Sequence, residues 1–140
     1  PATKFAIADA ALRAGRPALI AGALGVTGTV VAQAREGACY RCLFEQPPDG
    51  AGSCSADGVL APTVGVIAGV AVTAALEMLA NPGAVSQVWS IDDVCTGRPP
   101  RQLQFQPRPD CAHHRRSMGG TDSADGADGA GGALATEAMR

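Results

Sequence analysis

The apolar residues at the start of the chain recur with the period of an α-helix. Gly15 and Pro17 follow this pattern, and both residue types are typical of the end of a helix. We therefore expect a helix over about the first 15 residues. Its apolar side is formed by Phe5, Ile7, Ala8, Ala11 and Leu12.

Two short apolar stretches, residues 17–24 and 28–35, follow and are typical of strands. The glycines at 22, 25 and 28 have a spacing that resembles a dinucleotide-binding loop. Such a loop should open a helix, whereas the residues after Gly28 are β-branched and continue as a strand. The pattern therefore favours a turn between neighbouring strands over a phosphate-binding loop.

Residues 61–83 form a long apolar run that ends at Asn81-Pro82-Gly83, a strong helix stop. Its length raises the alternative of a membrane span. Glu77 interrupts the run, the apolar part before it is too short, and much of it is Gly and Ala. We expect a buried helix of a soluble domain, in which Gly65 and Gly69 allow another backbone to come close.

The last two apolar segments, residues 86–94 and 101–111, are expected to be strands. In the second one Leu103 and Phe105 alternate with Gln, which is typical of a half-exposed strand. Residues 43–58 are rich in Pro, Gly and Asp and are expected to form a loop. The order of helix, two strands, long helix and two strands predicts an α/β fold whose sheet has an antiparallel portion.

The composition limits the folded part to a single domain. The chain has 140 residues, and residues 117–140 are so rich in Gly, Ala and Asp that we expect a disordered tail after a folded region of residues 1–116. The net charge of −2 and one short basic cluster at 113–117 argue against nucleic-acid binding. Five cysteines, an odd number, without a signal peptide favour the cytoplasm over a secreted disulfide scaffold.

Four residues form two pairs with the spacing of zinc ligands. Cys39 and Cys42 form a C-x-x-C pair, and Cys111 and His114 form a C-x-x-H pair. Tetrahedral zinc takes such ligands, and four protein ligands leave no open position, so the zinc would be structural. A redox C-x-x-C pair is a weaker alternative, because the residues around it do not open a helix as such pairs usually do. His113 remains open as the ligand in place of His114.

The other two cysteines have no partner nearby in the sequence. Cys54 lies in a loop just before the long apolar helix, where the helix dipole favours a thiolate. The alternative is that Cys54 is an ordinary small residue. Cys95, at the end of a predicted strand, has no assigned role.

Several motifs together resemble the C-terminal half of the MoeB/ThiF/HesA family, the bacterial relatives of ubiquitin-activating enzymes. The motifs are "CYRCLF", then a cysteine followed by "GVLAPTVGVIAG", then a C-x-x-[C/H] pair near the end. Residues 2–24 resemble the segment that follows the Asp-Asn motif of the family. The resemblance implies a Rossmann-like mixed sheet of parallel and antiparallel strands with flanking helices. It also implies a homodimer and ATP·Mg-dependent adenylation of the C-terminal glycine of a ubiquitin-like sulfur-carrier protein, as in molybdopterin or thiamine biosynthesis.

Residue by residue, the resemblance places Cys39, Cys42 and Cys111 at zinc-ligand positions and His114 where the family has its last cysteine. Cys54 matches a loop cysteine that is implicated in thioester or persulfide chemistry with the carrier. Such a thiolate is well suited to attack an acyl adenylate.

The nucleotide-binding motifs of the family precede Pro1 in family order, and the chain has no initiator Met. Lys4 and Ala8 also stand where the family often has Arg and Asn. We therefore expect a fragment of an adenylyltransferase that does not adenylate alone. The alternatives are a non-catalytic module for carrier binding or dimerisation, and a non-functional relic.

Overall fold

The computed structural model describes residues 2–47, 52 and 54–113, apart from the side chain of Cys54. Within these residues, a helix or strand is present in every segment where the hydrophobic pattern predicts one, and three short helices accompany them. The last strand is shorter than expected, because it ends at Gln104 and not at residue 111, and all of its residues are exposed. In chain order the elements are α1 (Ala2–Arg13), β1 (Ala18–Leu24), β2 (Thr27–Gln33), α2 (Tyr40–Leu43), α3 (Cys54–Asp57), α4 (Ala61–Ala80), β3 (Gln87–Ile91), the 3-10 helix η1 (Val94–Thr96) and β4 (Arg101–Gln104). The segment expected to be a loop, residues 43–58, therefore contains the short helix α3. The predicted tail, residues 117–140, lies outside the described residues.

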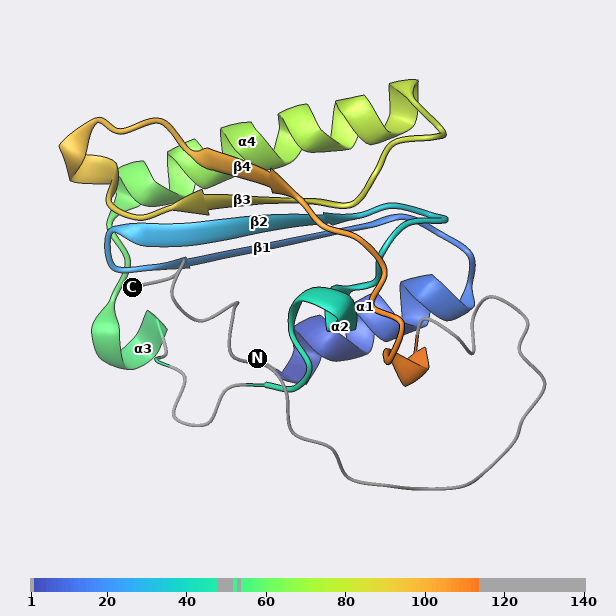
Figure 1. Ribbon diagram of the computed structural model, residues 1–140. Helices are drawn as coiled ribbons and strands as arrows, with labels where there is room; N and C mark the ends of the chain where they lie inside the picture. Colours follow the sequence, from blue (N-terminus) through green and yellow to red (C-terminus); the bar gives the residue numbers. More distant parts are fainter. Residues whose placement is uncertain (1, 48–51, 53, 114–140) are drawn as a thin grey trace.

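The sheet has four strands in the order β1-β2-β3-β4, and all neighbours pair antiparallel. The expected parallel strands are not among the described ones, where the single parallel pairing is an isolated bridge between Gly25 and Val59. The path of the chain explains this difference. The segment after β2 returns to Gly25 before α4 begins, and α4 then runs back, so β3 starts beside the end of β2 and must run antiparallel to it (Figure 1).

Helices cover the two faces of the sheet, with α4 on one face and α1 and α2 on the other (Figure 1). Because alternate residues of a strand point to opposite faces, Val30 and Ala32 pack toward α4 while Val31 packs toward α1.

Each face of the sheet has its own cluster of buried side chains. The cluster on the α4 side includes Ile67, Ala74, Trp89 and Ile91. The cluster on the α1 side includes Phe5, Ala8, Ile20, Tyr40 and Val88. The buried core is thus divided into two layers by the sheet.

The glycine-rich stretch between β1 and β2 is a hairpin turn, as the sequence favours. Leu24 pairs with Thr27, so two residues make the loop, and Gly25 adopts φ +55, a conformation that side chains disfavour. Gly25 also accepts hydrogen bonds from the Leu60 backbone N–H (2.9 Å) and the Thr63 hydroxyl (3.2 Å). The loop therefore holds the start of α4 instead of a phosphate group.

Helix α4 is buried along one side only, although a buried helix is expected. Thr63, Ile67 and Ala74 are buried, whereas Leu76 and Leu79 are 62% and 77% exposed. By length and composition α4 is the one helix among the described residues that could cross a membrane. The prediction for Ile7 of α1 is also wrong. Helix α1 packs against the sheet through Phe5 and Ala8, and Ile7 lies outside this contact and is exposed.

Candidate metal centre

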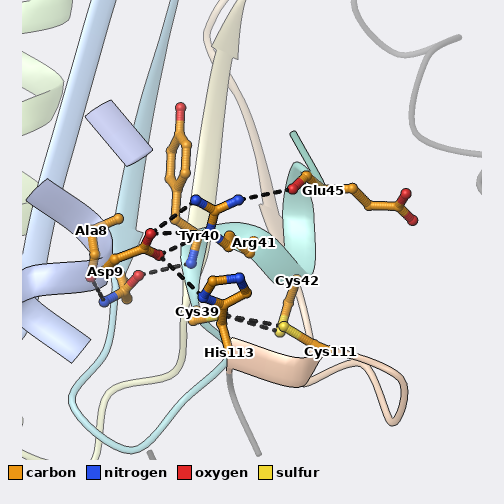
Figure 2. Close-up of polar contacts among 10 residues, drawn as sticks. Ala8, Asp9, Cys39, Tyr40, Arg41, Cys42, Glu45, Cys111 and His113 are labelled. Carbon is orange, nitrogen blue, oxygen red and sulfur yellow. Dashed lines mark hydrogen bonds and ion pairs between the residues drawn. The ribbon is translucent and has the colours of Figure 1, made fainter. Parts of the chain in front are cut away.

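Three of the four predicted metal ligands come together on the α1 side of the sheet (Figure 2). Cys39 immediately precedes α2, Cys42 lies within α2, and Cys111 lies beyond β4. The C-x-x-C pair therefore does open a short helix, contrary to the expectation from the sequence, so this is no argument against a redox pair. The buried sulfur of Cys111 beside the pair is what favours a metal site. The Sγ atom of Cys39 lies 3.6 Å from that of Cys42 and 3.6 Å from that of Cys111. All three Sγ atoms are within 4.8 Å of one another, and all three residues are buried.

The first pair is held by two buried side chains, one at the end of β2 and one just before β3. Gln33, at the end of β2, accepts a hydrogen bond from the Tyr40 backbone N–H (2.7 Å) and donates one to the Ala8 carbonyl of α1 (3.2 Å). Ser86 donates its hydroxyl to the Ala38 carbonyl (2.7 Å) and accepts the Ala34 backbone N–H (3.0 Å). These bonds set the position of the turn that carries Cys39 and Cys42 independently of any metal.

The second segment is attached to the first around Arg108. The Arg108 backbone N–H donates to the Cys42 Sγ at 3.5 Å, and its carbonyl accepts the Cys111 backbone N–H at 3.1 Å. The Arg108 side chain pairs with Glu45, which follows α2, and with Asp110. Backbone and side chain together therefore bring Cys111 to the first pair.

The three thiols favour one thiolate. The hydrogen bond with Cys39 lowers the pKa of Cys42 to about 5, helped by the Arg108 backbone N–H and opposed by burial. The same hydrogen bond, and then burial, raise the pKa of Cys39. Thiolates are the preferred ligands of zinc, and three buried sulfurs this close fit three corners of a tetrahedral site with Zn–S distances of about 2.3 Å.

Of the other predicted site residues, the structure describes only some. His114 lies outside the described residues, and the Nδ1 atom of His113 lies 3.9 Å from a carboxylate oxygen of Asp9 (Figure 2). Cys54 is the first residue of α3, and its side chain is outside the description. Cys95 is exposed in η1 and donates its backbone N–H to Asp93.

Asp9 and Arg41 border the thiols and were not predicted from the sequence. The Arg41 side chain forms an ion pair with Asp9 at 2.9 Å, and its guanidinium lies 5.0 Å from the centre of the Phe5 ring. The hydrogen bond with Asp9 raises the pKa of Arg41. The signal in the sequence was only that Arg41 stands between the two cysteines of the C-x-x-C pair, since Asp9 is 32 residues away.

Comparison with known proteins gives a consistent result. The chain matches the ThiF family over residues 1–112. It is 34% identical over 114 residues to the adenylyltransferase and sulfurtransferase MOCS3 of Sus scrofa, covering 79% of this chain and 25% of the relative. It is 32% identical over 94 residues to the adenylyltransferase and sulfurtransferase uba4 of Emericella nidulans, covering 59% of this chain and 20% of the relative. The chain therefore spans about a fifth to a quarter of the length of these relatives.

Proposed function

Because this chain belongs to the ThiF family, we propose that it is part of an ATP-dependent enzyme that adenylates the C-terminal glycine of a ubiquitin-like sulfur-carrier protein. The names of the relatives, adenylyltransferase and sulfurtransferase, support the reaction class. The carrier, of the kind used in molybdopterin or thiamine biosynthesis, follows from the resemblance of the motifs. We place the protein in the cytoplasm, as a homodimer when joined to the rest of the enzyme.

Within that enzyme, this portion supplies a structural zinc centre. This proposal depends on one observation: the buried sulfurs of Cys39, Cys42 and Cys111 lie close together. The first two cysteines and the third come from segments that α4, β3 and β4 separate in the sequence. The C-x-x-H spacing assigns His114 as the fourth ligand. A bound zinc ion would cross-link the turn before α2 to the segment after β4, and four protein ligands would leave it no role in the reaction.

The sheet is proposed to be the C-terminal portion of a Rossmann-like mixed sheet. Strand β1 lies at one edge of the sheet that the structure describes, so parallel strands from the nucleotide-binding half can extend the sheet there. In the family, ATP and Mg²⁺ bind to that half. We expect residues 1–140 alone not to adenylate, because donors for the triphosphate and a carboxylate for Mg²⁺ come from it.

Cys54 is proposed as the thiol that receives the activated carrier. Its sulfur would form a bond to the glycine carbonyl carbon of the acyl adenylate, the bond from that carbon to the phosphate oxygen would break, and AMP would leave. The thiol proton would pass to solvent. The product is a thioester between Cys54 and the carrier.

A second candidate is a non-catalytic module that binds the carrier or forms a dimer. The exposed apolar side of α4, which includes Val72, Leu76 and Leu79, favours a role in association. The remaining alternative is a relic without function, in which such an exposed apolar surface would have no partner.

Metal analysis and activity measurements test these proposals separately. Purified protein should contain zinc, and the His114→Ala variant should lose it while His113→Ala keeps it. ATP–pyrophosphate exchange with a carrier protein should be absent for residues 1–140 and present when the chain is supplied with the nucleotide-binding half. Binding of the carrier by the chain alone, with no exchange in either form, would favour the non-catalytic module. Zinc-free protein would contradict the structural centre.

A further inference from the structure

We propose that Asp9 of α1 is a positioning residue of the metal centre, because its carboxylate connects the two segments that carry the thiols. It holds Arg41 of the first segment and faces His113 of the second. This inference rests on the proposed zinc site, and it assigns a role to a residue that has neither a metal-ligating thiol nor the spacing of a ligand pair.

The contact between Asp9 and Arg41 is bidentate and partly shielded from water. The Nε atom of Arg41 donates to both carboxylate oxygens, at 3.0 and 3.1 Å, and Nη2 donates to one of them at 2.9 Å. The Asp9 side chain is only 15% exposed and the Arg41 side chain 22%. The Phe5 ring lies against the guanidinium, and Nη1 donates to the Glu45 carbonyl at 3.2 Å. Such a fork has one preferred geometry, in contrast to a surface ion pair between flexible side chains.

This geometry matters for the thiols because Arg41 lies inside the C-x-x-C turn. Helix α2 has only four residues, too few to be stable alone, so contacts made by its side chains must orient it. Arg41 reaches α1 while Cys42, the next residue, turns its sulfur toward Cys39 and Cys111 (Figure 2). The position of the guanidinium on Asp9 therefore restricts where the Cys42 sulfur can lie.

The same carboxylate faces the second segment. The Nδ1 atom of His113 lies 3.9 Å from Asp9, two residues beyond Cys111. Groups that hold a metal ligand commonly change metal affinity 10–100-fold when they are replaced. Asp9 acts one residue further away, through Arg41 and His113, so we expect an effect at the lower end of this range. Asp9 is the residue of α1 through which both segments are aligned.

The test compares Asp9→Asn with Asp92→Asn in the full chain. Asp92 also pairs with an arginine, Arg101, at 2.9 Å, but on an exposed surface away from the thiols. Zinc affinity would be measured by competition with a chromophoric chelator, and the geometry of the site by the absorption spectrum of the Co²⁺-substituted protein. We expect Asp9→Asn to weaken zinc binding about 10-fold and to alter the Co²⁺ spectrum, while Asp92→Asn changes neither.

A double-variant cycle separates positioning from general stability. We expect Asp9→Asn and Arg41→Gln together to weaken zinc binding no more than Asp9→Asn alone, and the exchange Asp9→Arg with Arg41→Asp to recover part of the affinity. If Asp9→Asn does not fold, Arg41→Lys decides, because it keeps the charge and loses the fork.

Zinc affinity and a Co²⁺ spectrum that stay at the wild-type values in Asp9→Asn, or in Arg41→Lys where that variant decides, would overturn the inference while leaving the zinc site intact. A wild-type chain that binds no zinc would instead overturn the proposed centre and this inference with it.

Discussion

The sulfur atoms of Cys39 and Cys111 lie 3.6 Å apart although 72 positions separate the two residues in the chain. Strands β3 and β4 and the long helix α4 lie between them in sequence. A metal bound here would therefore close a long loop. Because the unfolded chain does not hold the three sulfurs together, the free energy of metal binding would add to the stability of the folded state.

Replacement of Cys111 tests this cross-link directly. We expect Cys111→Ala to reduce the zinc content from about one ion per chain to nearly none, because only the first pair remains intact. The thermal midpoint should fall toward that of wild-type protein treated with a chelator and a reductant. The matched control is Cys95→Ala, an exposed cysteine outside the cluster, which should keep the wild-type zinc content. Equal zinc content in the two variants would contradict the site.

The stability of the metal-free protein should depend on pH through Cys42. Its pKa in the folded state is about 5, below the value of 9.0 for an ordinary thiol, so the unfolded state binds more protons between these values. The contribution of Cys42 to the free energy of unfolding is complete above about pH 9 and is lost as the pH falls toward about 5. Because the pKa of Cys39 is raised, that thiol opposes stability once the pH exceeds about 9.

Urea unfolding at pH 5.5–8.5, with a chelator and a reductant present, measures this contribution. The difference in unfolding free energy between wild type and Cys42→Ser should grow as the pH rises. Cys95→Ser should follow the wild-type pH dependence. A difference that shrinks with rising pH would show that Cys42 is not the favoured thiolate.

Gln33 is expected to stabilise the turn that carries the first thiol pair. Gln33→Leu leaves the Tyr40 backbone N–H and the Ala8 carbonyl without their buried partner, at a cost of about 1–3 kcal/mol in the free energy of unfolding. The control Gln104→Leu, on the exposed strand β4, should change stability by less than about 0.5 kcal/mol. Chemical denaturation of both variants with zinc removed would measure the difference.

Gly28 should not tolerate a side chain, because β2 and α4 approach closely there. A Cβ atom at this position would lie 2.8 Å from the Gly22 carbonyl oxygen and would also collide with Ile67. We expect Gly28→Ala to destabilise the protein by about 1–3 kcal/mol. Gly65→Ala is the control, since a Cβ there meets nothing within 4 Å and removes a glycine from a helix, with an expected gain of up to about 1 kcal/mol. In thermal unfolding, the midpoint should fall for Gly28→Ala and rise for Gly65→Ala.

Local patterns in the sequence predicted the main helices and strands and the candidate metal ligands, but not the short helices α2, α3 and η1. The periods of 3.6 and 2, with Gly and Pro at the ends, located α1, β1, β2, α4, β3 and β4. The spacing of Cys39 and Cys42 indicated one metal ion, because two residues in the same turn can both reach it. The pairing direction of the strands was only partly predicted, since it depends on where the chain returns to the sheet before α4, at the bridge between Gly25 and Val59.

The sequence by itself determined which residues can form helices and strands and which thiols have the spacing of metal ligands, because both depend on short-range geometry. The spacing also indicated Cys111 as a further ligand, but only the tertiary structure shows its sulfur beside those of Cys39 and Cys42. Only the tertiary structure decided that α4 keeps an exposed apolar side and that Asp9 meets Arg41. These relations depend on how α1, α2 and the segment after β4 pack against one face of the sheet. Packing brings together residues whose distance in the sequence carries no information about their distance in space.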